Sequence, residues 1–220
     1  MASNFVNAIY KEEAHDRLWI GTRNGFSCYD LARRTYRNYL SPAQPSHTAG
    51  TDVLALAQTA DGTLWVGTIN QGLWQLRRPG TAREQLVPCT RPAGVPQGSV
   101  ESLAEDRYGT VWAASLAQGL RRYGPDGRAE LPTDQSMFLL YDRPHDVLWA
   151  STRDAGLLKL RVLPDSLVLL RQFVANPNGV DGLSVSYTWP LLLDRAGTLW
   201  IGTIGGGPHR SAATATPAEA

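Results

Sequence analysis

The sequence predicts an all-β protein made of repeated four-stranded antiparallel units, and three features of the chain support this prediction. A short block with a central tryptophan recurs five times: Leu18–Thr22, Leu64–Thr68, Val111–Ser115, Leu148–Thr152 and Leu199–Thr203. Their tryptophans lie 46, 47, 37 and 51 residues apart: Trp19, Trp65, Trp112, Trp149 and Trp200. The flanks repeat as well, because an apolar run precedes the blocks and a Gly-apolar pair follows four of them. A period of roughly 40–45 residues is that of one blade, so the predicted fold is a β-propeller.

The second unit shows the four expected strands of a blade in order. Residues 52–58 are nearly all apolar and are bounded by turn formers, as in a strand that is buried on both faces. A turn at Asp61-Gly62 leads into Leu64–Thr68, whose side chains favour a pleated surface. After a loop at 69–71, a third strand is expected at Leu73–Leu76 and a weaker fourth around Glu84–Val87. No long window carries a helical period, so we expect almost no helix.

The repeat divides residues 1–207 into blades at 1–45, 46–93, 94–133 and 134–177, with a partial blade at 178–207. In this last unit the glycine-rich segment 204–208 gives no apolar third strand, so we expect only an inner hairpin there. Residues 208–220 are rich in Ala, Thr and Pro and are expected to form a disordered tail. About four and a half blades are therefore predicted. Since an open arc leaves blade faces unburied, we expect a fragment of a larger propeller, with a closed five-bladed ring as the alternative.

Composition narrows the possible partners. The 21 Lys and Arg residues nearly balance 20 Asp and Glu residues, which gives no reason to expect nucleic acid or an anionic membrane surface. No stretch approaches the roughly 20 apolar residues of a membrane span. Residues 1–6 lack a basic region followed by an apolar one, so no signal peptide is predicted. Cys28 and Cys89 are expected to pack as small apolar residues rather than form a disulfide, and no metal site or cofactor is predicted.

The ordered motif resembles the two-component regulator propeller repeat, approximately Gly-Leu-Ser-x-Asn-x-Val-x-x-Ile-x-x-Asp-x-x-Gly-x-Leu-Trp-Ile-Gly-Thr. The fifth unit matches this pattern best, at Gly182-Leu183-Ser184, Leu191, Asp194, Gly197 and Leu199–Thr203. The third unit keeps Gly94, Val100, Leu103, Asp106 and Gly109. The second has Thr59 where the family usually has Asp, and the fourth, with Trp149-Ala-Ser-Thr152, departs furthest. The resemblance covers the chain up to about residue 207.

This resemblance implies a sensor module. In the family, such repeats form the extracytoplasmic propellers of bacterial hybrid histidine kinases and related signalling proteins, many of which are implicated in sensing carbohydrate fragments. It therefore implies a periplasmic or extracytoplasmic module whose partners are a small-molecule or oligosaccharide ligand and a signalling output domain, or further propeller blades. Kinase activity would reside in that output domain, so we expect no enzymatic activity from this chain.

Candidate ligand-binding residues follow the tryptophan blocks. The loops occupy the same place in every blade, so their polar side chains should share one face, and amides and guanidinium groups suit hydroxyl-rich or carboxylated ligands. We call Arg23, Asn24, Asn70, Gln71, Gln118, Arg153 and Asp154 the loop face; Trp189, an off-pattern tryptophan like Trp74, is a further candidate. The competing explanation is that surface loops are polar in any protein. The five repeat tryptophans are expected to pack between blades.

Other motifs have structural explanations. The pairs Arg33-Arg34, Arg77-Arg78 and Arg121-Arg122 are interpreted as solvated edge charges. Asp106, Asp142 and Asp194 occupy equivalent turns and are expected to accept hydrogen bonds from their own backbone. The four histidines show no metal-binding spacing, and no nucleophile motif is present. The leading hypothesis is thus a ligand-sensing propeller, with a protein-interaction scaffold and a propeller lyase as alternatives.

Overall fold

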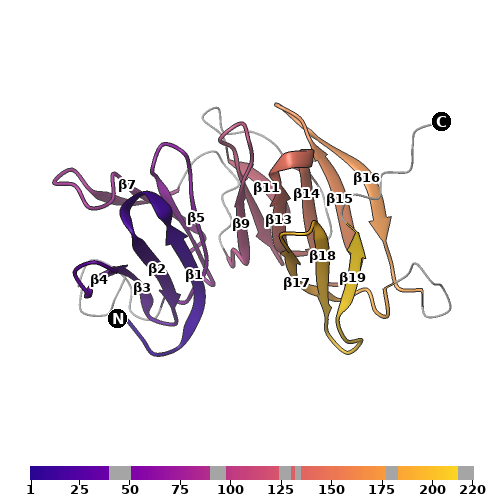
Figure 1. Ribbon diagram of the computed structural model, residues 1–220, viewed down its shortest axis with the longest axis horizontal. Coiled ribbons are helices and arrows are strands. Elements are labelled where there is room, and N and C mark those ends of the chain that lie inside the picture. Colours follow the sequence, from indigo (N-terminus) through magenta and orange to yellow (C-terminus); the bar gives the residue numbers. More distant parts are fainter. Residues whose placement is uncertain (40–50, 90–97, 124–129, 132–134, 177–182, 213–220) are drawn as a thin grey trace.

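A computed structural model describes residues 1–39, 51–89, 98–123, 130–131, 135–176 and 183–212 (Figure 1). The first sheet comprises β1 (Val6–Glu12), β2 (Arg17–Thr22), β3 (Gly25–Asp30) and β4 (Thr35–Tyr39). The second comprises β5 (Val53–Gln58), β6 (Leu64–Thr68), β7 (Leu73–Arg77) and β8 (Gln85–Pro88). The third comprises β9 (Ser102–Glu105), β10 (Val111–Ser115), β11 (Gly119–Tyr123) and β12 (Glu130–Leu131). The fourth comprises β13 (Ser136–Asp142), β14 (Val147–Thr152), β15 (Leu157–Val162) and β16 (Leu167–Phe173), and the fifth β17 (Thr188–Leu193), β18 (Thr198–Thr203) and β19 (His209–Ala212).

Each sheet is an antiparallel meander, in which every strand pairs with the next one along the chain. The first strand of each sheet packs against the first strand of the following sheet, from β1 to β5, β9, β13 and β17. The sheets are thereby arranged as successive blades around their innermost strands, with the first and second at the left of the view and the fourth and fifth at the right (Figure 1). This arrangement confirms the predicted all-β fold of propeller blades.

The fifth blade corrects one expectation from the sequence. It is a three-stranded sheet rather than an inner hairpin, because β19 pairs with β18 along Thr198–Ile201. A strand at the outside of a blade is held by backbone hydrogen bonds, so it does not need the apolar side chains that we looked for. β19 takes the first residues of the segment 208–220, which we expected to be disordered; residues 213–220 lie outside the described residues.

Helix is confined, in the described ranges, to two single turns of 3-10 helix, η1 (Glu13–His15) and η2 (Arg143–His145). Each of them joins the first two strands of its blade and ends at an aspartate in the left-handed region, Asp16 or Asp146. Within the same ranges, no helix has the length and apolar character needed to cross a membrane.

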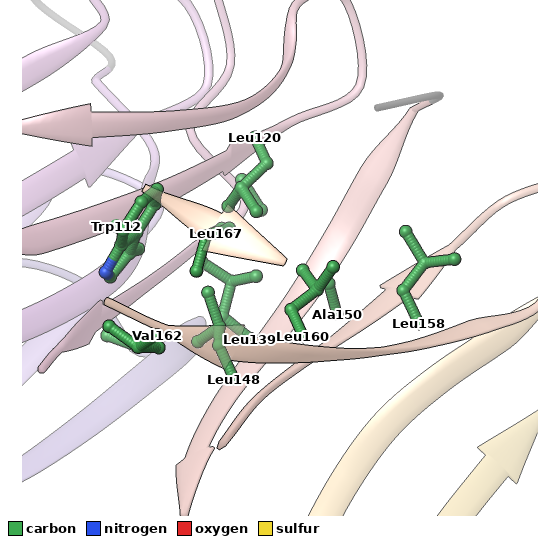
Figure 2. Packing of buried hydrophobic residues seen from close by; sticks show 11 residues of the cluster. Trp112, Leu120, Leu139, Leu148, Ala150, Leu158, Leu160, Val162 and Leu167 are labelled. Atoms are coloured by element: carbon green, nitrogen blue, oxygen red, sulfur yellow. The ribbon is translucent and has the colours of Figure 1, made fainter. Parts of the chain in front are cut away.

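The repeat tryptophans of the first four blades pack between blades, as the sequence predicts, whereas Trp200 of the fifth blade is 40% exposed. Trp19 lies in a cluster with Val53 and Leu64 of the second blade, and Trp149 in a cluster with Leu191 and Leu199 of the fifth. Figure 2 shows the corresponding cluster of the third and fourth blades, formed by Trp112, Leu120, Leu139, Leu148 and Leu167 among others. Each of the first four tryptophans therefore faces the two apolar residues that flank the tryptophan of the next blade.

A hydrogen bond between the end of the second strand and the start of the third explains why the blocks end in threonine and are followed by glycine. The threonine hydroxyl donates to the glycine carbonyl, from Thr22 to Gly25 at 2.8 Å, Thr68 to Gly72 at 2.8 Å and Thr152 to Gly156 at 2.7 Å. The fifth blade repeats this bond between Thr203 and Gly207. All four glycines have positive φ, which residues with a side chain rarely adopt, so the turn requires glycine.

An aspartate before two of the tryptophan blocks has a second role that the sequence did not reveal. Asp106 accepts the backbone N–H groups of Tyr108 and Thr110 at 2.8 and 3.0 Å, which confirms the predicted turn. Its other oxygen accepts the indole N–H of Trp112 at 2.8 Å. Asp194 repeats this arrangement with Trp200, whose indole N–H holds the pKa of the carboxyl group below its usual range.

In the first blade a glutamate takes this role, since Glu12 accepts the indole N–H of Trp19 at 2.8 Å. The turns of the second and fourth blades differ from this pattern. Asp142 does not form the expected turn, because an additional residue in the connection places its carboxylate 2.8 Å from Nδ1 of His145 instead. Thr59 stands where Asp106 stands in its blade, and the buried indole N–H of Trp65 has no hydrogen-bond partner among the described residues.

We expect replacement of Asp106 with alanine to lower the free energy of unfolding by about 2–4 kcal/mol. The change leaves a buried indole N–H and two backbone N–H groups without their acceptor, and hydrogen bonds to charged groups contribute about 1.5–3 kcal/mol each. Asp61→Ala is the matched control, since Asp61 accepts the N–H of Thr63 in an exposed turn and holds no tryptophan. Equal losses in urea unfolding of the two variants would contradict a role for the indole bond.

Candidate functional site

Topology places the predicted loops on one face of the propeller. Each loop joins the second strand of its blade to the third, and the strands run in the same order and sense in every blade. The loops are residues 23–24, 69–72, 116–118, 153–156 and 204–208. The loop face is therefore a property of the fold, whereas ligand binding there remains a prediction.

The loops are held rigidly at the inner side of the blades. The backbone N–H that follows the threonine donates to the carbonyl group just before the innermost strand: Arg23 to Phe5 at 3.1 Å, Ile69 to Asp52 at 2.9 Å, Arg153 to Gln135 at 3.1 Å and Ile204 to Tyr187 at 3.0 Å. The innermost strands β1, β5, β13 and β17 also change register beside these ends. Such bulges aim side chains away from the regular pleat, and they are frequent next to binding sites.

Arg23 connects the first and second blades. Its guanidinium lies 4.8 Å from the centre of the Phe5 ring, and its Nε is 3.9 Å from a carboxylate oxygen of Asp52. Because Arg23 is mostly exposed, this ion pair contributes little stability. The contacts instead hold the guanidinium between Phe5 and Asp52. Asn24 lies beside it, with its backbone N–H 3.3 Å from the hydroxyl of Thr22.

The second and third blades contribute amide side chains. Asn70 is exposed, and the backbone N–H of Gln71 donates to the Thr68 hydroxyl at 3.0 Å, which holds the loop in place. Gln118 is half-buried, and its carbonyl oxygen Oε1 has no hydrogen-bond partner among the described residues. This oxygen is an acceptor that a ligand hydroxyl group could satisfy.

The fourth and fifth blades contribute a cation and an aromatic side chain. Arg153 and Asp154 are exposed, and the Arg153 guanidinium forms no ion pair within the described ranges. Trp189 is 46% exposed on β17. Arg23, Asn70 and Arg153 form no hydrogen bond with one another, so the structure brings the predicted residues to one face without joining them into a cluster.

Sequence reasoning missed Phe5 and Asp52, which contact Arg23 from the connections before β1 and β5. Both residues directly precede an innermost strand, so their position in the repeat was a signal that could have identified them. Off-pattern Trp74 is half-buried in the cluster between the first two blades and does not lie on the loop face. Cys28 borders the same cluster, and burial raises the pKa of its thiol to about 11, in keeping with a packing role.

A pocket of about 230 Å³ lies elsewhere, near the far end of β3. It is lined by Arg17, Trp19, Cys28, Asp30, Arg33, Thr35, Tyr36, Arg37, Tyr39 and Gly80. Two of its three guanidinium groups are already paired, Arg33 with Asp30 at 3.1 Å and Arg37 with Glu84 at 2.7 Å. These internal pairs leave the pocket less suited to an anionic ligand than its arginine content suggests.

A serine and a histidine also approach one another, between the segment before β17 and β19. Nε2 of His209 lies 2.7 Å from the Ser184 hydroxyl and 3.0 Å from the Ser184 backbone nitrogen. The hydroxyl donates to the Gly206 carbonyl at 2.8 Å. The pair thus fastens β19 to the preceding connection. No three His, Cys, Asp or Glu side chains gather into a cluster anywhere in the described ranges.

Comparison with known proteins supports the fold and the repeat. Residues 49–70 match the model of the family described as two component regulator propeller. No curated protein sequence matches the chain. Among solved structures, an extracellular domain assigned to a hybrid two component system of B. thetaiotaomicron is similar with a TM-score of 0.74 and 22% identity. That match covers 95% of this chain and 27% of the other, so the chain spans about a quarter of the length of that relative.

Two further structures share the fold. PorZ, a bacterial surface component of the type-IX secretion system of Porphyromonas gingivalis, has a TM-score of 0.69 at 19% identity, over 92% of this chain and 31% of its own. Streptogramin B lyase has a TM-score of 0.63 at 18% identity, over 99% of this chain and 71% of its own. The predicted recognition is therefore confirmed: the chain is a β-propeller that carries the two component regulator propeller repeat, matched at residues 49–70.

Proposed function

We propose that this chain is the ligand-sensing propeller module of a bacterial two-component signalling protein. The observation that carries the proposal is the match of the second blade to the two component regulator propeller family, together with a loop face that repeats in every blade. The structurally similar extracellular domain of a two component system supports an extracytoplasmic location. In this role the module binds a small molecule and transmits the event to an output domain, which is its signalling partner.

The chemistry of the loop face favours a hydroxyl-rich or carboxylated ligand, such as a saccharide. Asn70, Gln71 and Gln118 provide both donors and acceptors for ligand hydroxyl groups. Arg153 provides a planar guanidinium that can bind a carboxylate with two parallel hydrogen bonds. Trp189 follows Thr188, which pairs with Thr203 at the loop end of β18, and it provides an exposed apolar surface for a sugar ring.

The alternatives find less support in the same residues. A lyase needs acidic and basic side chains near its substrate. Among the seven residues of the loop face, Asp154 is the single acidic residue. Streptogramin B lyase shares the fold at low identity, and a fold alone does not carry an activity. We therefore propose a binding module without enzymatic activity of its own.

The proposal predicts a selective effect of Arg153. Isothermal calorimetry with digalacturonate, a carboxylated disaccharide, should detect binding, and Arg153→Ala should weaken it at least about tenfold through loss of a charge-assisted hydrogen bond. Arg161→Ala is the matched control, because Arg161 is an exposed arginine on β15, outside the loop face. The neutral disaccharide digalactose should be insensitive to Arg153. Failure of both saccharides to bind, or equal losses in the two variants, would overturn the proposed site.

A further inference from the structure

The two terminal blades expose complementary halves of the junction that joins all the others. The tryptophans of the first four blades are buried, from Trp19 at 0% to Trp65 at 9% exposed. Trp200 of the fifth blade is 40% exposed, and Leu192, its cross-strand neighbour, is also exposed. In each of the first four blades, the following blade covers this tryptophan face. In the fifth blade the same face is exposed, so one half of a junction between blades is left uncovered.

The first blade carries the opposite half-junction, in which much of the innermost strand is exposed while Leu18 is half-buried and Ile20 is buried. At the other junctions, the tryptophan of one blade packs on the blade that follows it. There it contacts the two residues that flank the following blade's own tryptophan, and a leucine of that blade's innermost strand, such as Leu139 or Leu191. Ile9 is the equivalent of that leucine in the first blade, since it pairs with Ile20 as Leu139 pairs with Ala150. Ile9 is 66% exposed.

An ion pair distinguishes this junction from a merely apolar surface. Between the third and fourth blades, Arg107 of the turn before β10 pairs with Asp146, the left-handed residue after η2. Arg195 stands in the same place before β18, five residues ahead of the tryptophan, and Asp16 stands in the same place after η1. Both side chains are exposed, and neither forms an ion pair in the described part of the chain.

From these observations we propose that two copies of this chain associate head to tail. Trp200 and Leu192 of one copy pack on Ile9 of the second, and Arg195 of the first pairs with Asp16 of the second. The contact repeats two parts of the junction between the third and fourth blades, the tryptophan on the innermost strand and the arginine–aspartate pair, while Lys11 replaces Tyr141, which donates to Asp146 there. Because the two surfaces differ, the contact is heterologous, and it can repeat until a ring of copies closes.

Light scattering coupled to size-exclusion chromatography tests this proposal with two surface variants of the full chain. The wild-type chain should show a mass above the 24.0 kDa of one copy, and the mass should rise with concentration. Trp200→Arg and Ile9→Arg should each be monomeric, with affinity lowered at least about thirtyfold as for buried interface tryptophans. Their equimolar mixture should form a dimer, because each variant keeps one intact face.

Charge reversal provides an independent readout if either of those variants fails to fold by circular dichroism. Arg195→Asp and Asp16→Arg should each weaken association about fivefold. A mixture of the two should recover the wild-type affinity, because Arg195 of the Asp16→Arg variant can pair with Asp16 of the Arg195→Asp variant. A wild-type chain that stays monomeric at every concentration would overturn the proposal. So would an Ile9→Arg variant that dimerises alone, since that result would mean that two identical tryptophan faces pair.

Discussion

Replacement of Trp112 with alanine is expected to lower the free energy of unfolding by about 3–5 kcal/mol, as for large aromatic residues in packed cores. Trp112 is 1% exposed and contacts the leucines of the next blade, including Leu139 and Leu148 (Figure 2). The change also removes the indole donor from the buried carboxylate of Asp106. The loss therefore combines a cavity between two blades with a broken hydrogen bond to a charged group.

The same substitution at Trp200 is the matched control. Trp200 occupies the same position in the repeat and donates the same bond, to Asp194, but it is exposed. At low protein concentration, where copies do not associate, we expect Trp200→Ala to lower the free energy of unfolding by about 1 kcal/mol. Urea unfolding followed by far-UV circular dichroism measures both values. Equal losses would mean that packing between blades is not what the repeat tryptophan provides.

Replacement of Gly156 with alanine is expected to cost at least about 3 kcal/mol of unfolding free energy. Gly156 has φ +78°, and an added Cβ would lie 2.0 Å from the backbone carbonyl oxygen of Phe173. The left-handed conformation alone costs about 1–2 kcal/mol for a residue with a side chain. The remainder comes from the overlap, which only a shift of β16 could relieve.

Gly109→Ala separates these two causes. Gly109 has nearly the same φ, +74°, and no atom lies within 4 Å of an added Cβ. We therefore expect a loss of only about 1–2 kcal/mol from the backbone conformation. If the two glycine variants unfold at the same urea concentration, close packing at Gly156 does not stabilise the fourth blade.

The blades could be predicted from the sequence because short motifs of neighbouring residues mark their strands. Tryptophan blocks mark the second strand of every blade, and the Gly-apolar pairs mark the third. β19 was missed because an outer strand is held by backbone pairing, which side-chain polarity does not report. The bond between Asp106 and Trp112 was also missed, although an aspartate six residues before a tryptophan recurs in two units and was visible in the sequence.

The candidate site was predictable in position and not in detail. Repetition alone placed Arg23 and Arg153 on equivalent loops. The partner of Arg23, Asp52, belongs to the next blade, and only the packing of β1 against β5 brings the two together. The arginine-lined pocket near β3 combines residues of two blades for the same reason, so no local pattern could reveal it.

Binding at the loop face is the central claim, and amide chemical shifts in a nitrogen-15-labelled sample test it most directly. On titration with digalacturonate, shifts should concentrate at residues 23–24, 70–71, 118 and 153–154, with smaller changes at the adjoining strand ends. Shifts confined to the pocket around Arg33 and Gly80, or a spectrum that does not change at all, would contradict the account.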